Sequence, residues 1–137
     1  MTDKNLNITP LQNSISRLEE ALEVYRNDPS NTLIRDGLIQ RFEFTYEVSH
    51  KMLKRYLEWT SPTPEQYDNV DFQTLIRNGN EQGLLRGEWV DWKMYRDMRS
   101  KTSHAYDEQL ALTVVSGIPA FFAEARHLYE QLKIRLS

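Results

Sequence analysis

Apolar residues recur along most of this chain at the three- and four-residue spacing of an α-helix. The first such stripe follows Thr9 and Pro10, which suit the cap and the first position of a helix. Its members are Leu11, Ile15, Leu18 and Leu22. The polar stretch 27–30 contains a proline and predicts the end of this helix.

The longest periodic segment predicts one helix over residues 32–59. This helix would span about 40 Å at roughly 1.5 Å per residue. Its apolar stripe is broad, which indicates contact with more than one neighbouring helix. The stripe consists of Ile34, Leu38, Ile39, Phe42, Thr45, Tyr46, Ser49, Met52, Leu53, Tyr56 and Leu57. Two prolines in the stretch 61–64 predict its end, because proline lacks the backbone donor that a helix needs.

Shorter helices are predicted further along the chain. One starts at Asp71, and the Asn-Gly-Asn sequence at 78–80 weakens its continuation. Another carries Trp89, Trp92 and Met98, which we assign to the core or to a subunit surface.

The last predicted helix starts near Asp107 and Glu108, whose charges suit a helix N-terminus. Gly117 and Pro119 predict an interruption within it, since proline removes a donor and strains the preceding turn. No segment alternates convincingly between apolar and polar residues as a strand does. The sequence therefore predicts an all-α fold, an antiparallel bundle of four to five helices in a single domain over residues 1–137.

The composition limits the classes of function. With 137 residues the chain can bury a core of its own. Its net charge of -3 and pI of about 5.6 argue against a general affinity for nucleic acid, although a local site could still act on RNA. The lack of cysteine excludes disulfides, thiolate catalysis and cysteine-based metal sites. The scattered histidines 50, 104 and 127 form no metal-binding pattern, so we expect no metal and no cofactor.

The N-terminal sequence MTDKNLNITP has no apolar stretch, so no signal peptide is expected. No uninterrupted apolar segment is long enough to span a bilayer, and no membrane partner is expected. We therefore expect a cytoplasmic protein, which the lack of cysteine also allows.

Two stretches of the chain carry a resemblance to a known family. One is IQRFEFTYEVSHKMLKRYL at residues 39–57, and the other is RDMRSKTSHAYDE at residues 96–108. In this order and at this separation they resemble the nucleotidyltransferase substrate-binding protein family. That family belongs to the HEPN superfamily and includes the HepT toxins. The likeness covers residues 11–132.

The resemblance implies a helical-bundle protomer that forms a homodimer and binds a minimal nucleotidyltransferase. In the family's toxin–antitoxin pairs the helical component is a metal-independent ribonuclease. The nucleotidyltransferase silences it, in some systems by transferring AMP to a tyrosine. The family motif places its arginine, histidine and tyrosine on Arg99, His104 and Tyr106. This chain departs from the usual pattern at Ser100, where relatives carry Asn, Asp or His, and at His50, where many carry Trp.

Cleavage of RNA without a metal needs a group that moves protons and a cation that stabilises the charge on the phosphorane. Histidine titrates near neutral pH, which suits His104 to the first role, and Arg99 offers a planar cation to phosphate oxygens. On a straight helix these two residues would lie roughly 140° apart. A helix break around 103–107 would turn His104 back, whereas a homodimer would place two motifs in one cleft. The sequence is compatible with both.

Several polar residues near the motif are further candidates for binding. Arg96 and Lys101 can supply positive charge to phosphate. Thr102 and Ser103 can donate hydrogen bonds to phosphate or cap the helix end instead. Tyr106 can receive AMP, hydrogen-bond the histidine or the phosphate, or simply pack its ring.

Purely structural roles compete with these assignments. Arg99 can pair with a carboxylate, and His104 can occupy a helix junction. Glu43 and Glu47 lie one turn apart and are expected to form a solvated or ion-paired face. The expected partners are Arg41 and Lys51 for the glutamates, and Asp97 or Glu108 for Arg99.

The sequence thus supports two main functions. The first is a HepT-like toxin component with metal-independent ribonuclease activity at a dimer cleft, and the intact set of Arg99, His104 and Tyr106 favours it. The alternative is a non-catalytic substrate-binding or docking subunit of a nucleotidyltransferase complex, which Ser100 and the acidic pI favour. A bundle that serves dimerisation alone is a weaker third possibility.

Overall fold

The computed structural model describes residues 6–137, so the first five residues of the predicted domain and of the N-terminal stretch lie outside the described part. Within residues 6–137 every regular element is a helix, which confirms the all-α prediction. The elements are α1 (Thr9–Asn27), α2 (Thr32–Thr60), α3 (Phe72–Glu81), α4 (Trp89–Lys101) and α5 (Glu108–Leu136), with the 3-10 turns η1 (Pro64–Tyr67) and η2 (Thr102–His104). None of these described helices has the length and apolar character of a bilayer span.

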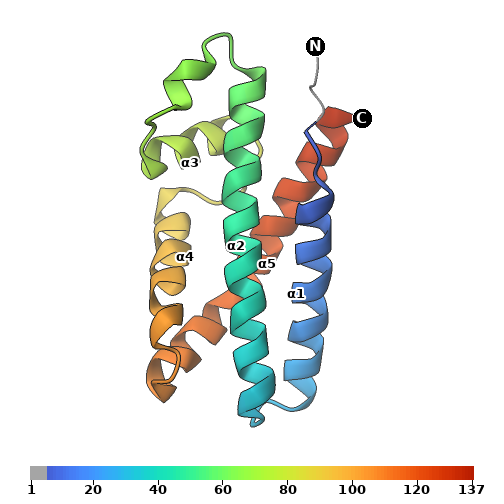
Figure 1. The fold of residues 1–137 in the computed structure, drawn as a ribbon, viewed down its shortest axis with the longest axis vertical. Helices are drawn as coiled ribbons and strands as arrows, with labels where there is room; N and C mark the ends of the chain where they lie inside the picture. Colours follow the sequence, from blue (N-terminus) through green and yellow to red (C-terminus); the bar gives the residue numbers. More distant parts are fainter. Residues whose placement is uncertain (1–5) are drawn as a thin grey trace.

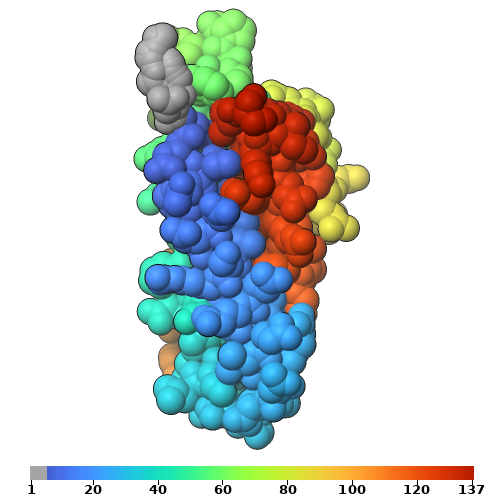
Figure 2. Space-filling view, turned by 90° about the vertical axis from the view of Figure 1, so that its right-hand side faces the viewer, coloured from blue at the N-terminus to red at the C-terminus, as the bar shows by residue number. Residues whose placement is uncertain are grey.

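The long helices form an antiparallel bundle, as predicted (Figure 1). α1 and α4 run in one direction, and α2 and α5 run in the other. The short α3 lies near the C-terminal end of α2 and the N-terminal end of α4. α2 stands in the middle and contacts every other helix. Figure 2 shows α1 and the C-terminal part of α5 side by side on one face of the molecule. Because α4 and α2 run in opposite directions, the α4–α5 corner lies at the same end of the bundle as the start of α2 (Figure 1).

The core is built around aromatic rings from α2, α4 and α5. Phe42 and Phe121 meet edge to face with their ring centroids 5.1 Å apart, and Trp92 and Tyr95 do so at 5.4 Å. Edge-to-face contacts suit aromatic rings because the positive edge of one ring faces the negative face of the other. Trp92 and Met98 are both buried, which places them in the core of the protomer.

The helices start at polar signals close to the predicted ones. Asn31 on α2, Asp71 on α3 and Asp107 on α5 each accept hydrogen bonds from backbone N–H groups of the first turn. The prediction that Thr9 caps α1 is wrong. The helix already begins at Thr9, and the side-chain oxygen of Asn7 accepts the Thr9 N–H at 3.1 Å.

α3 continues through the Asn-Gly-Asn sequence at 78–80 that was expected to weaken it. Gly79 is buried, and a Cβ at this position would lie 3.0 Å from Leu53 Cδ1 and 3.1 Å from Leu85 Cδ1. The glycine therefore allows α3 to approach α2 and the following loop closely, and tertiary packing overrides its low helix propensity.

The predicted interruption of α5 at Gly117 and Pro119 is wrong, because α5 is one continuous helix with Pro119 inside it. Pro119 itself is exposed, whereas Ile118 and Phe121 on the inner face are fully buried. A proline inside a helix costs about 3 kcal/mol. Packing of the inner face of α5 against the core offsets this cost.

Replacing Asp107 by alanine is expected to lower the free energy of unfolding by about 1 kcal/mol. The Asp107 carboxylate accepts the Leu110 N–H at 3.1 Å at the start of α5. Asp107→Asn keeps this acceptor and is the matched control, expected to stay close to the wild type. Urea denaturation at neutral pH compares the three proteins. Equal stability of wild type and Asp107→Ala would show that the cap contributes nothing.

A buried carboxylate on α5 holds the loop between α3 and α4. Glu124 is 2% exposed and accepts the backbone N–H groups of Arg86 at 3.0 Å and of Gly87 at 2.7 Å. Burial raises the pKa of Glu124 above the usual 4.5, although the two N–H groups and the nearby charges of Arg86 and His127 oppose the shift. The contact fixes the residues directly before α4, the helix that carries Arg99.

Stability is expected to depend on pH through Glu124. The folded protein binds the proton more tightly than the unfolded chain, so the free energy of unfolding falls as the pH rises from 4.5 through the raised pKa. Glu124→Gln cannot ionise and is expected to lack this part of the decline. Glu130→Gln, at an exposed glutamate of the same helix, is expected to keep it. Urea denaturation from acidic to neutral pH tests this, and an unchanged decline in Glu124→Gln would contradict it.

Candidate functional site

The motif lies at the corner where α4 turns into α5, at one end of the bundle (Figure 1). The break predicted around 103–107 is present and begins one residue earlier, where η2 (Thr102–His104) replaces the α-helix. Arg99 therefore lies on the last turn of α4, His104 ends η2, and Tyr106 follows in the turn before α5.

Arg99 is held by two carboxylates of α2. Its Nε donates to Glu47 Oε2 at 3.1 Å, and its Nη1 lies 3.3 Å from Glu43 Oε2. Nη1 also donates to the hydroxyl oxygen of Thr102 at 3.2 Å. The expectation that Arg99 pairs with a carboxylate is confirmed, and both partners come from a helix distant in sequence.

The expected partners of these charges differ from those in the structure. Glu108 accepts a hydrogen bond from the buried Arg35 at 2.8 Å and not from Arg99. Arg41 pairs with Glu20 of α1 at 2.7 Å and not with Glu43. These differences share one cause, because packing between helices places charges opposite each other that lie far apart along the chain.

Thr102 ties the corner to α2 as well. It is buried, its hydroxyl donates to Glu43 Oε2 at 2.6 Å, and the same hydroxyl lies 2.7 Å from the carbonyl oxygen of Arg99. Ser103 is exposed, and its hydroxyl donates to the carbonyl oxygen of Ser100 at 3.3 Å, as a residue at a helix end often does. Thr102 is thus engaged with protein groups, whereas Ser103 is accessible.

His104 and Tyr106 face solvent. Their rings meet edge to face with centroids 6.1 Å apart, and Tyr106 is 86% exposed. Among residues 6–137, the His104 side chain makes no hydrogen bond or ion pair, either with Arg99 or with any other residue. The helix break therefore leaves the imidazole without a fixed partner in the described part of one protomer.

An open hollow of about 540 Å³ lies between α2 and the corner. Tyr106 and Thr102 line it on one side, and Arg35, Asp36 and Glu43 on the other. Two carboxylates and one guanidinium line this hollow, so its net charge is negative and it does not attract phosphate by itself.

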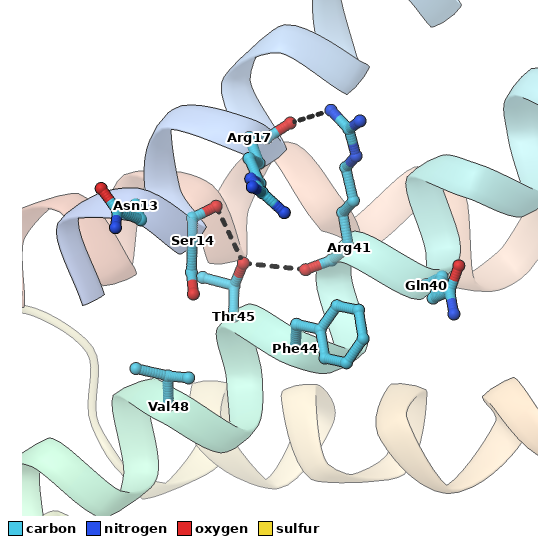
Figure 3. Close-up of a pocket in the computed structure, with 8 residues that line it drawn as sticks. All are labelled: Asn13, Ser14, Arg17, Gln40, Arg41, Phe44, Thr45 and Val48. Carbon is cyan, nitrogen blue, oxygen red and sulfur yellow. Dashed lines mark hydrogen bonds between the residues drawn. The ribbon is translucent and has the colours of Figure 1, made fainter. Parts of the chain in front are cut away.

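A second hollow of about 560 Å³ lies between α1 and α2 (Figure 3). Gln40 lines both hollows, and Phe44, which is 60% exposed, stands at the wall of the second one. The lining holds no carboxylate and no imidazole, so it offers no acid or base for catalysis. In the described part of the chain no group of three acidic or histidine side chains is arranged to hold a metal ion.

Arg96 and Lys101 lie on the same helix as Arg99. The Arg96 guanidinium carbon lies 5.0 Å from the ring centroid of Trp89 and 5.7 Å from that of Phe72, so the cation is supported by two aromatic rings. Arg96 is exposed, and within residues 6–137 no carboxylate forms an ion pair with it. Its charge therefore remains available to an anion.

The sequence did not identify Glu43 and Glu47 as neighbours of the motif. The available signal was their one-turn spacing on a predicted helix, inside the stretch 39–57 that carries the family resemblance. Their contacts with Arg99 depend on how α4 packs against α2, which the sequence pattern does not specify.

Comparisons with known proteins agree with this fold. Residues 6–134 match the family model described as "Nucleotidyltransferase substrate binding protein like". A Haemophilus influenzae protein named "Probable ribonuclease HepT" is 37% identical over 143 aligned positions, covering 98% of this chain and 97% of that protein. A solved structure from the same species, described as the fold of a substrate-binding domain of a nucleotidyltransferase, is 35% identical with a TM-score of 0.83. It covers 94% of this chain and 99% of its own.

Proposed function

Because the chain belongs to the nucleotidyltransferase substrate-binding protein family, we propose that it is the HepT-like partner of a minimal nucleotidyltransferase in a toxin–antitoxin pair. In this proposal the free protein is a metal-independent endoribonuclease of the cytoplasm. The observation that carries it is the α4–α5 corner, where α2 fixes Arg99 and the exposed His104 has no hydrogen-bond or ion-pair partner among residues 6–137.

The proposed reaction is cleavage of a phosphodiester bond of RNA by its own 2′-hydroxyl. The 2′-oxygen bonds to the adjacent phosphorus, and the bond from phosphorus to the 5′-oxygen breaks. An imidazole takes the proton of the 2′-hydroxyl, and an imidazolium gives one to the leaving 5′-oxygen. His104 supplies these groups, and the Arg99 guanidinium stabilises the charge that develops on the non-bridging oxygens.

A homodimer supplies both protonation states of the histidine side chain, imidazole and imidazolium, in one cleft, since each protomer contributes one His104 and one Arg99. Two observations support this arrangement. The His104 imidazole has no hydrogen-bond partner among the described residues, and Tyr106 is 86% exposed, so both side chains are accessible to a second copy. The rate of cleavage per protomer is expected to fall when dilution or substitution dissociates the dimer, as monitored by analytical ultracentrifugation. A monomer with full activity would contradict the composite cleft.

Arg96, Lys101 and Ser103 are proposed to contact RNA phosphates beside the cleft. Tyr106 is the proposed acceptor of AMP from the nucleotidyltransferase, and its exposure allows a second enzyme to reach the phenol. An added AMP would bring a negative phosphodiester and a bulky base, and both oppose RNA binding by repulsion and occlusion.

Tyr106→Phe should still cleave RNA, yet take up no AMP and escape silencing.

A non-catalytic docking subunit is the second candidate function. The observation that favours it is the pair of carboxylates on Arg99, since Glu43 and Glu47 together outweigh its positive charge. In this case the protein binds the nucleotidyltransferase tightly and leaves RNA intact.

Incubation of the purified protein with structured and unstructured RNA in EDTA decides between the two functions. Cleavage in EDTA by the free protein, which is lost after the protein has first been incubated with the purified nucleotidyltransferase, ATP and Mg²⁺, supports the toxin. Intact RNA, with a protein shown to be folded and dimeric, supports the docking subunit instead. Growth inhibition on expression alone, relieved by the partner, is the matching test in cells.

A further inference from the structure

The contacts of Arg99 leave part of its guanidinium available. A guanidinium carries five N–H groups, one on Nε and two on each terminal nitrogen. The Nε–H group meets Glu47, and Nη1 meets Thr102 and Glu43. Within residues 6–137, Nη2 has no hydrogen-bond partner. The protein thus holds one side of the group and leaves two N–H donors for a ligand.

The clamp also restrains the direction of the guanidinium. Its partners come from two elements, with Glu43 and Glu47 one turn apart on α2 and Thr102 on η2. The Thr102 hydroxyl in turn donates to Glu43 at 2.6 Å, which orients that carboxylate. An arginine with a single exposed partner keeps several rotamers, whereas three partners on two elements restrict it strongly.

We infer that Glu43 and Glu47 are positioning residues for RNA cleavage, which act through Arg99 by aiming its free Nη2 edge at the phosphate. This inference rests on the proposed ribonuclease function. Neither carboxylate is a phosphate ligand, because negative groups repel each other. The carboxylates therefore restrict the geometry of the cation and oppose RNA binding at the same time.

The two effects give the inference a kinetic signature. Loss of a carboxylate frees the guanidinium, and misplacement of a group that stabilises the transition state lowers kcat. The same loss removes a negative charge near the substrate, so KM does not rise. A merely structural role would lower the amount of folded protein instead, or raise KM by distorting the binding surface.

The test measures kcat and KM on a short single-stranded RNA in EDTA for the full-length dimer. Glu47→Ala is expected to lower kcat by about 10- to 100-fold without raising KM. Glu47→Gln keeps an oxygen acceptor for the Arg99 Nε–H group and is expected to recover most of kcat. Glu43→Ala is expected to change kcat and KM in the same way as Glu47→Ala. If Glu43→Ala does not fold, Glu43→Gln is measured in its place.

Glu20→Ala is the matched control, because it also removes a helix glutamate paired with an arginine, Arg41, at 2.7 Å. Its kcat and KM are expected to match the wild type. The NMR signal of the Arg99 Nε–H group provides a readout independent of activity, and it should be protected from exchange in the wild type and lost in Glu47→Ala.

The outcomes separate this inference from the proposed function. If the wild type cleaves RNA and Glu47→Ala keeps its kcat, the positioning role is wrong while the ribonuclease stands. A rise in KM at constant kcat would likewise overturn it, since that result assigns the glutamates to binding. If the wild type cleaves no RNA, the positioning role and the ribonuclease function are both wrong. A protected Arg99 Nε–H signal would then show that the contacts of Arg99 with Glu43 and Glu47 serve only the structure of the bundle.

Discussion

Replacing His104 by alanine is expected to reduce RNA cleavage in EDTA by about 100- to 10,000-fold. The proposed reaction loses its proton donor and acceptor with this side chain. The fold should be unaffected, because the imidazole is exposed and forms no hydrogen bond with the described residues. The variant should therefore keep the wild-type circular dichroism spectrum, urea midpoint and dimer.

The matched control for His104→Ala is His127→Ala. His127 lies in the second half of α5, and its Nε2 is 3.2 Å from the carbonyl oxygen of Gly83. Its loss is expected to leave the cleavage rate unchanged. Cleavage by His104→Ala at the wild-type rate would remove the histidine from the mechanism. Loss of activity in both variants would point to a general effect on folding.

Replacing Arg99 by lysine is expected to lower kcat by about 100- to 1,000-fold, although the positive charge is kept. Lysine presents one compact ammonium group and cannot reproduce the planar fork that meets Glu43, Glu47 and Thr102 while leaving Nη2 free. Single-turnover cleavage of RNA in EDTA measures this effect.

Arg41→Lys serves as the control for Arg99→Lys. Arg41 also bridges two helices, through Glu20 and the carbonyl oxygen of Arg17, yet it lies outside the motif. Its substitution is expected to leave kcat unchanged. If Arg99→Lys retained wild-type kcat, a positive charge alone would suffice, and the fixed orientation of the guanidinium would have no role in catalysis.

Much of the fold could be predicted because the relevant signals are local. The apolar stripe at 32–59 gave the bounds of α2 closely, and Asp71 and Asp107 marked the starts of α3 and α5. Pro119 misled the prediction, since the propensity of one residue says nothing of the buried face that surrounds it. Gly79 misled it in the same way, because the close approach of Leu53 and Leu85 is a property of packing.

The candidate site also has local features that the sequence predicts and long-range contacts that it does not. The sequence by itself determined that the chain is a helical bundle, that a polar break separates the last two helices, and that Arg99, His104 and Tyr106 stand at this break. These features lie within a few residues of one another and follow from spacing, caps and the family motif. Only the tertiary structure decided what surrounds them. It sets Arg99 against Glu47, 52 residues away, and Thr102 against Glu43, 59 residues away. Such pairs depend on the rotation and offset of α4 on α2. Several packing geometries of the two helices would bury the same apolar stripes and yet place different charged residues opposite each other, so the sequence pattern does not select one of them.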